Sequence, residues 1–175
     1  MKNILNVEDL QSMARKRVPK MFYEYADSGS WSAETYKANE NDFSKIKFRQ
    51  RVGVNIENRT LSKTFLGKKV SIPLALAPTG LCGMQHYNGE ILSAQASEEF
   101  GIPFTLSTMS ICSIEDVAEA TSQPFWFQLY VMRDKAFISN LLNRAQDAGC
   151  NVLQITMDLN ILGQRHADVR NGLSA

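Results

Sequence analysis

The sequence predicts an α/β fold of four βα units, half of the eight that would close a barrel, preceded by a helical extension. Short apolar runs typical of buried parallel strands recur about every 25 residues, and a helical pattern follows each of the first three. Polar residues cluster where each run ends, which is where the loops of a βα barrel build an active site. An open doubly wound sheet would also bind ligands there and is the alternative architecture.

The first part of the chain has a polar, helical pattern that becomes irregular. Asn6 is the expected cap of a first helix, and Pro19 suits the first turn of a second. Gly29 can adopt the left-handed backbone conformation that often ends a helix, so the second helix is expected to end near it. A third helix is expected from Ala33 to Phe43. These patterns predict a helical start rather than a strand of the sheet.

A short hairpin is expected before the regular part of the chain. Between Phe48 and Val70, β-prone pieces flank the turn Leu66-Gly67-Lys68-Lys69. We therefore divide the single predicted domain, residues 1–175, into an N-terminal helical and irregular extension over residues 1–72 and the first four barrel strands over residues 73–175.

The regular part alternates strands and helices. The predicted strands are Pro73 to Ala77, Pro103 to Leu106, Phe125 to Leu129 and Val152 to Thr156. Asn88 is the expected cap of the first intervening helix, and Ser113 with Asp116 forms a capping-box pattern for the second. Asp134 opens the third, which Gly149 closes. No G-x-G-x-x-G or G-x-x-x-x-G-K-[ST] motif follows a strand, which argues against a dinucleotide or P-loop fold.

Composition and charge exclude several function classes. The chain is 44% hydrophobic and 21% charged with a net charge of +1, so neither nucleic acid nor an anionic membrane is an expected partner. No run approaches the roughly 20 apolar residues of a membrane span, and no signal peptide is expected. Cys82, Cys112 and Cys150 lack metal-type spacing, so we expect buried free thiols, a cytoplasmic location and no metal.

Four strand-end residues have the chemistry of a flavin site. A flavin ring is flat and apolar, and it needs nearby backbone N–H groups and side-chain amides or hydroxyls around its polar edge. Gly80, Ser107, Gln128 and Thr156 have those properties, and each follows a different predicted strand. One such residue alone is more often a turn former. All four occur at the same place, the strand end, in consecutive βα units, and this indicates a shared site.

A second group suits a small carboxylate. Arg165 can form a bidentate clamp, and the hydroxyls of Tyr25 and Tyr130 can add oriented hydrogen bonds. The alternatives are a surface ion pair for the arginine and helix packing for Tyr25. His86 and His166 are the candidate general bases, but a helix start directly follows His86, which favours a structural hydrogen bond. We expect neither histidine to be the base.

Several segments together resemble one family along essentially the whole chain. They are VPKMFYEYADSG at 18–29, APTGLCGM at 77–84, FTLST at 104–108, WFQLY at 126–130, TMD at 156–158 and GQRHAD at 163–168. In this order they resemble the FMN-dependent L-2-hydroxy-acid dehydrogenase and oxidase family, whose fold is a (βα)8 TIM barrel. Asp158-Leu159-Asn160 departs from the proline-containing turn of many relatives.

The resemblance implies FMN as cofactor and a role for each matched residue. The loop whose backbone lies against the flavin is Pro78, Thr79 and Gly80. The side chains implied to hydrogen-bond FMN are Ser107, Gln128 and Thr156. The residues implied to hold the substrate are Tyr25, Tyr130 and Arg165. Oxidase relatives more often carry alanine in place of Gly80, and the segment from Gly80 to Met84 is most similar to bacterial respiratory L-lactate dehydrogenases.

The implied reaction oxidises an L-2-hydroxy acid, with L-lactate as the expected substrate, to the 2-oxo acid. FMN is reduced, and a quinone or cytochrome takes the electrons. The alternatives are an oxidase that uses O2, a non-catalytic half-barrel that serves interaction or assembly, and a phosphate-binding barrel without flavin. Attachment at the inner face of the cell membrane and a homo-oligomer are both compatible with the resemblance.

The resemblance also implies that catalysis needs more than these residues. The family's base histidine, flavin-facing lysine, second substrate arginine and second phosphate-binding segment match positions beyond residue 175. We therefore assign no catalytic residue within the chain. Turnover is expected only when a C-terminal half supplies these groups.

Overall fold

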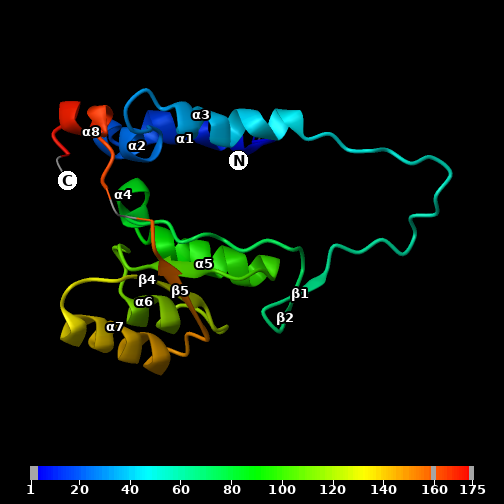
Figure 1. Cartoon of the computed structure of the whole chain (residues 1–175). Coiled ribbons are helices and arrows are strands. Elements are labelled where there is room, and N and C mark those ends of the chain that lie inside the picture. Colours follow the sequence, from blue (N-terminus) through cyan, green and yellow to red (C-terminus); the bar gives the residue numbers. More distant parts are fainter. Residues whose placement is uncertain (1–3, 159–160, 174–175) are drawn as a thin grey trace. The chain divides into compact units, whose positions relative to one another are not determined.

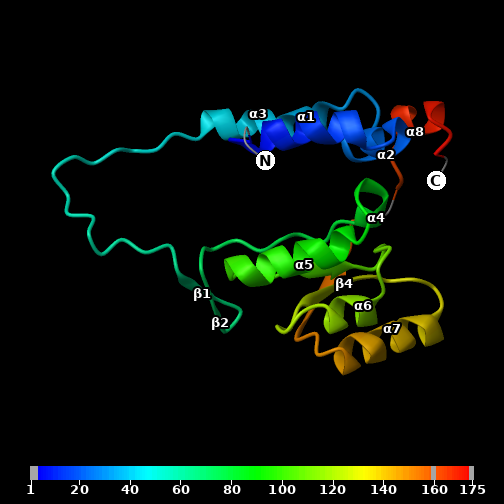
Figure 2. The same cartoon turned by 180° about the vertical axis from the view of Figure 1, so that it is seen from behind.

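The computed structural model describes residues 4–158 and 161–173, which form two compact units. One unit contains residues 4–58 together with 161–173, and the other contains residues 59–158. Figures 1 and 2 show their elements from opposite sides. The segment after the last strand, residues 161–173, belongs to the same unit as the N-terminal helices.

The first unit is helical. Its elements are α1 (Val7–Arg17), α2 (Lys20–Ala26), α3 (Glu34–Asn41), the 3-10 helix η1 (Asp42–Lys45) and α8 (His166–Arg170). Asn6 caps α1 as predicted, because its Oδ1 accepts a hydrogen bond of 2.9 Å from the N–H of Asp9. Pro19 precedes α2 directly and occupies its N-cap position. The helical extension is therefore present with the predicted starts of its first two helices.

Gly29 has a different role from the predicted one. Its φ is not positive; the left-handed residues in this turn are Trp31 and Ala33, with φ of 53° and 58°. Glycine is needed for close approach instead, since a Cβ on Gly29 would lie 2.8 Å from the Cβ of Tyr36. The left-handed Ala33 also explains why α3 begins at Glu34, one residue later than predicted.

The second unit begins with the predicted hairpin. Strands β1 (Lys63–Phe65) and β2 (Lys68–Val70) are antiparallel. Leu66 and Gly67 connect them with φ of 45° and 79°, as a two-residue hairpin turn with left-handed central residues requires. Lys68 and Lys69, expected in the turn, belong to the strand.

A parallel sheet forms the centre of this unit. Its strands are β3 (Thr105–Ser107), β4 (Trp126–Tyr130) and β5 (Val152–Thr156), in the order β3-β4-β5. The helices are α4 (Cys82–Gln85), α5 (Gly89–Phe100), α6 (Ile114–Glu119) and α7 (Lys135–Asp147). Figures 1 and 2 both show α5, α6 and α7 bordering the strands. The chain thus contains the alternating elements of the predicted βα units.

The first predicted strand is only partly formed. Of Pro73 to Ala77, a single residue, Leu76, pairs in parallel with Phe104. Pro73 has no N–H to donate to a ladder, and the N–H of Leu74 donates to the carbonyl of Ile72 instead. This local turn replaces the first ladder positions, so a bridge stands where the sequence predicted a strand.

In the second unit, the helix caps agree with the sequence in two helices, α6 and α7. Ser113 and Asp116 form a capping box, with both hydrogen bonds at 3.0 Å. Asp134 caps α7, and Gly149 follows that helix with φ of 79°. Asn88 precedes α5 but makes no side-chain cap, because its backbone is left-handed with φ of 54°, whereas a capping side chain needs extended backbone.

Alternation along the strands separates two faces of the sheet. Leu106, Phe127 and Leu129 point to the helices and form the core with Val117 of α6 and Leu141 of α7. The residues between them, such as Ser107 and Gln128, belong to the opposite face. In β5 the helix-side residues Leu153 and Ile155 remain 44% and 51% exposed. The apolar core therefore lies mainly between β3, β4 and the helices.

The cap of α7 leads to a stability prediction. Asp134→Ala removes the carboxylate that accepts hydrogen bonds from the N–H groups of Ala136 and Phe137. We expect the free energy of unfolding to fall by about 1 kcal/mol. The measurement is urea unfolding followed by circular dichroism. The control is Asp147→Ala at the other end of α7, where loss of an acidic side chain should leave stability unchanged or raise it slightly; equal losses in both variants would contradict the cap.

The ion pair between α6 and α7 leads to a pH prediction. Arg144 binds Glu115 through two hydrogen bonds of 2.6 and 2.7 Å, and these bonds lower the pKa of Glu115 to about 2. A depressed carboxylate pKa stabilises the fold above the unfolded value of about 4.3, and this stabilisation is lost as pH falls through the folded value. Because both side chains are partly exposed, Glu115→Gln should cost less than about 1 kcal/mol at pH 6.

The same pair can be tested by titration of stability. The difference in unfolding free energy between the parent chain and Glu115→Gln should shrink toward zero as pH falls from 5 to about 2. Glu119→Gln, at an exposed position of the same helix, serves as the control. A difference that stays constant over this pH range would show that the ion pair does not cause it.

Candidate functional site

A line of polar side chains crosses the carboxyl ends of the three strands. Gln128, 1% exposed, accepts hydrogen bonds of 3.2 Å from Ser107 Oγ and from the N–H of Thr108. Its Nε2 donates to Thr156 Oγ1 at 2.8 Å. The structure therefore brings together three predicted cofactor residues from β3, β4 and β5. Each of these side chains forms a hydrogen bond with a neighbour in the line, and buried polar groups need such partners.

Thr108 joins this line and was not singled out by its sequence. Its hydroxyl donates to the carbonyl of Gln128 at 2.5 Å and accepts from the N–H of Tyr130 at 3.1 Å. It thereby ties the end of β4 to the loop that follows β3. Thr108 directly follows Ser107 in the FTLST segment, so its place at a strand end was the available signal.

Gly80 lies beside the same line. A Cβ on Gly80 would lie 3.1 Å from the Cβ of Met109 and 3.7 Å from Ser107 Oγ. Pro78 and Thr79 precede it and lead into α4. The structure thus places the predicted loop next to the predicted side chains, with little room for a residue larger than glycine.

Tyr130 ends β4 at the same carboxyl edge. It pairs in register with Thr156, the last residue of β5, and its side chain is partly exposed. Both residues belong to the face of the sheet that points away from the helix-side core. This edge therefore offers a phenol and a hydroxyl next to the buried amide of Gln128.

The other two predicted substrate residues meet in the helical unit. The guanidinium carbon of Arg165 lies 4.5 Å from the ring centroid of Tyr25, and its Nη2 donates to the backbone carbonyl of Tyr25. This stacking is a cation–π contact. The structure brings these two members together, while Tyr130 belongs to the sheet unit. The unusual turn predicted at Asp158-Leu159-Asn160 includes residues 159 and 160, which are outside the described residues.

Asp168 holds the arginine and was given no role in the sequence analysis. Its Oδ2 accepts a hydrogen bond of 2.5 Å from Arg165 Nε, and its side chain is buried. A buried carboxylate fixes the guanidinium plane by a charge-assisted bond. The i,i+3 spacing of Arg165 and Asp168 at the start of α8 was the signal that could have revealed the pair.

Both histidines have local partners. His86 Nδ1 lies 2.7 Å from the carbonyl oxygen of Tyr87, which fits the structural role expected for it. His166 Nε2 lies 3.2 Å from Gln164 Oε1, and its ring meets Trp31 edge-on at 5.8 Å. Each ring thus has a hydrogen-bonding partner nearby in the sequence, and the ring of His166 also packs on Trp31 in the turn before α3.

The three cysteines are free, but only Cys112 is fully buried; Cys82 and Cys150 are partly exposed, contrary to the sequence expectation. Burial nevertheless raises the pKa of both Cys82 and Cys150 to about 11. These thiols are therefore protonated near neutral pH and poor nucleophiles. Among residues 4–158 and 161–173, no three His, Cys, Asp or Glu side chains are arranged to hold a metal ion.

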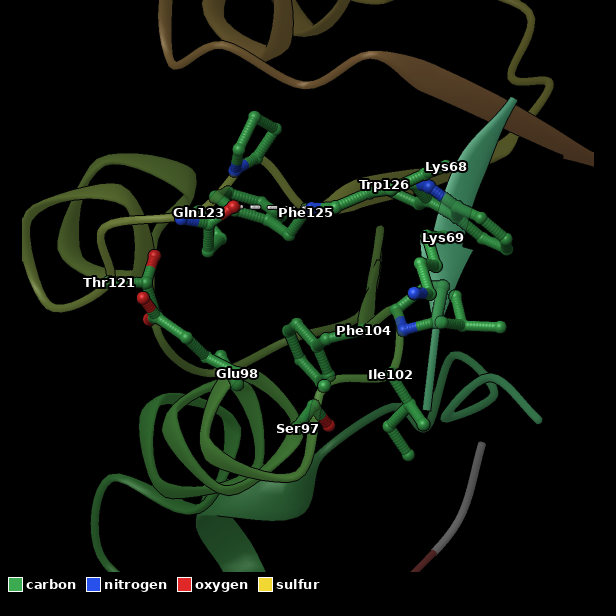
Figure 3. A pocket seen from close by; sticks show the side chains of 15 residues that line it. Lys68, Lys69, Ser97, Glu98, Ile102, Phe104, Thr121, Gln123, Phe125 and Trp126 are labelled. Carbon is green, nitrogen blue, oxygen red and sulfur yellow. Dashed lines mark hydrogen bonds between the residues drawn. The ribbon is translucent and has the colours of Figure 1, made fainter. Parts of the chain in front are cut away.

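A hollow of about 320 Å³ lies at the opposite, amino end of the strands (Figure 3). Phe104 and Trp126 line it from the sheet, Glu98 from α5 and Lys68 from the hairpin. None of the predicted FMN or substrate residues lines it. The polar line at the carboxyl ends is consequently the better candidate for a cofactor site.

Comparisons with known proteins agree with this arrangement. Residues 14–175 match the family model of FMN-dependent dehydrogenases. The L-lactate dehydrogenase of Haemophilus influenzae (strain PittEE) is 44% identical over 171 residues, which are 98% of this chain and 45% of the relative. The chain therefore belongs to the FMN-dependent dehydrogenase family, and it spans about half the length of the curated relatives it matches.

Solved structures give the same result. A soluble mutant of the membrane-associated (S)-mandelate dehydrogenase from Pseudomonas putida has a TM-score of 0.93 and 37% identity, covering 98% of this chain and 49% of that one. Mandelate oxidase has a TM-score of 0.91 and 29% identity, covering 99% and 50%. The predicted barrel class, present here as half a barrel, is confirmed, as is FMN as the cofactor of the family.

The hydrogen-bonded line leads to a prediction about stability. Gln128→Leu leaves the hydroxyls of Ser107 and Thr156 and the N–H of Thr108 without their amide partner. Because unsatisfied buried groups are costly, the free energy of unfolding should fall by about 1–3 kcal/mol. Urea unfolding of the parent chain and of the variant measures this loss of stability. Gln154→Leu is the matched control, since Gln154 pairs with Gln128 in register but is exposed; a comparable loss there would contradict this explanation.

Proposed function

We propose that this chain is the FMN-holding and substrate-holding half of an L-2-hydroxy-acid dehydrogenase, with L-lactate as substrate. The observation that carries the proposal is the line Ser107–Gln128–Thr156 beside Gly80 at the carboxyl edge of the sheet. Its donors and acceptors fit the polar rim of a flavin. The 44% identical L-lactate dehydrogenase supports lactate as the substrate.

The residues of the sheet would hold the cofactor ring in one orientation. Gln128 carries two amide hydrogens, of which one points to Thr156, so the other suits a ring carbonyl. The small Gly80 allows the backbone of its loop to lie against the ring. When bound, FMN supplies the chemistry of accepting two electrons from the substrate. We assign Pro78, Thr79, Gly80, Ser107, Gln128 and Thr156 to FMN.

The substrate is held by charge and by phenol groups. Arg165 presents a guanidinium fixed by Asp168 and Tyr25, which suits the carboxylate of a hydroxy acid. Tyr25 and Tyr130 would orient the carboxylate or the hydroxyl. The chain itself supplies binding and orientation, and we propose that the proton-accepting base comes from a C-terminal half, so the isolated chain does not turn over.

The electron acceptor follows from the same site. We propose a quinone or a cytochrome rather than O2, because Gly80 differs from the alanine of oxidase relatives and the residue there borders the flavin. An (S)-mandelate dehydrogenase described as a monotopic membrane protein is 36% identical over 99% of this chain, which supports a peripheral membrane position as one location. Over residues 4–158 and 161–173, no helix has the length and apolar character needed to cross a membrane.

The test is a flavin titration of the chain, alone and co-expressed with the C-terminal half of a relative. We expect absorbance and fluorescence to report FMN binding by the pair, and L-lactate to bleach the flavin only when both halves are present. If the pair folds without binding FMN, the assignment of the strand-end residues is wrong. Bleaching by the chain alone would refute the proposed need for a second half.

Substrate binding can be tested separately in the same pair. Arg165→Met should change the affinity for FMN by no more than about twofold. It should weaken the binding of lactate by about tenfold or more, because it removes a charged hydrogen-bond donor. Arg170→Met, at an exposed position in α8, the helix that follows Arg165, should change neither. Equal bleaching by lactate in both variants would exclude Arg165 as the carboxylate clamp.

A further inference from the structure

Glu90 is a buried charged residue with no assigned role. It lies in the first turn of α5 and is 1% exposed. An acidic residue at this position often does no more than complement the helix dipole from the surface. Burial of the carboxylate is costly and needs specific partners, so its contacts indicate what it does.

One oxygen of Glu90 joins helix α4 to the loop that follows β3. Glu90 Oε1 accepts hydrogen bonds from the N–H of Gly83 at 3.2 Å and from the N–H of Ile111 at 2.9 Å. Gly83 follows the Pro78–Gly80 loop, and Ile111 follows β3. A single carboxylate oxygen thus bridges residues 28 positions apart in the sequence.

The same two segments touch at two further points. The N–H of Leu81 donates to the carbonyl of Met109 at 2.8 Å. A Cβ on Gly83 would lie 2.6 Å from the Cβ of Ile111, so only glycine allows this approach. Gly80 and Ser107 are each within two residues of the Leu81–Met109 contact. The geometry of the proposed flavin loop therefore depends on how firmly these segments are held together.

The contacts of Glu90 favour the ionised form of its carboxylate. Burial raises the pKa of Glu90, but the hydrogen bonds from Ile111, from its own backbone, from Cys112 and from Gly83 outweigh burial and leave the pKa below its ordinary value. Bonds to an ionised acceptor are stronger than neutral ones. Oε2 is buried without a hydrogen-bond partner among the described residues, a cost that favours a specific role for the group.

We propose that Glu90 is a positioning residue that clamps the segment 78–84, which runs into α4, to the segment 107–111, which follows β3, and so fixes Gly80 beside Ser107. This inference rests on the proposed function, because the value of the clamp is the geometry it gives to the FMN-binding edge. Glu90 does not itself contact the cofactor in this scheme. It lowers the cost of binding by ordering the loop beforehand.

Two variants of similar size separate this role from simple packing. Glu90→Gln keeps an oxygen that can accept from both N–H groups, whereas Glu90→Met fills the same space without an acceptor. The control is Glu98→Met on the same helix, where the carboxylate accepts hydrogen bonds from Ser122 instead. Circular dichroism checks that each chain is folded before it is compared.

The first measurement is amide hydrogen exchange of the 175-residue chain by nuclear magnetic resonance. In Glu90→Met, exchange at Gly83 and Ile111 should be about tenfold faster or more, as expected for loss of a charged hydrogen bond. The capping-box N–H of Asp116 should be unchanged. Glu90→Gln and Glu98→Met should leave exchange at Gly83 and Ile111 within about threefold of the parent. Unchanged exchange at both amides in Glu90→Met would overturn the clamp.

The second measurement is FMN affinity and the visible circular dichroism of the bound flavin, in the chain paired with a C-terminal half. Glu90→Met should raise the Kd by about tenfold and change the flavin spectrum, and Glu90→Gln should restore most of both. If Glu90→Met exchanges faster at Gly83 and Ile111 but keeps the parent's affinity for FMN, Glu90 clamps the two segments and the proposed positioning role is overturned. If the parent pair binds no FMN, the proposed function fails, and exchange alone decides whether Glu90 holds the loops.

Discussion

Parallel strands end at one edge of their sheet, and here that edge carries polar side chains that need partners. Gln128 meets this need by accepting from Ser107 and the backbone of Thr108 and by donating to Thr156. The bonds join three strands whose other face is apolar and, in β3 and β4, packed on the helices. The hydrogen bonds that satisfy these buried groups also set the orientation of the groups proposed to bind the flavin ring. Stability and the proposed function therefore depend on one network.

Two further carboxylates, outside the strand ends, also form hydrogen bonds that hold groups near the proposed site. Glu90 joins α4 to the loop after β3, and Asp168 fixes the guanidinium of Arg165 in the helical unit. Neither is proposed to touch the cofactor. Asp168 binds a predicted substrate residue, and Glu90 binds backbone groups beside predicted cofactor residues, which is how outer residues hold a site to a defined geometry.

The half-barrel character of the chain appears in its last strand. β5 pairs with β4 along its whole length, but Leu153 and Ile155 on its helix side stay largely exposed. Such residues are normally covered in a parallel sheet, since both faces are buried. The relatives are about twice as long, which agrees with a fold in which further βα units complete the sheet.

The sequence by itself determined the elements whose signals are local. Asn6, Asp134 and the Ser113–Asp116 box need only neighbouring backbone N–H groups, and the alternation of β4 needs only its own residues. Tertiary structure decided what depends on distant atoms. Gly29 and Gly83 are small because another segment approaches them, the strand at Pro73 is reduced to one bridge, and Glu90 is a clamp rather than a surface charge. Close approach and burial join residues far apart in the chain, and no local pattern encodes those distances.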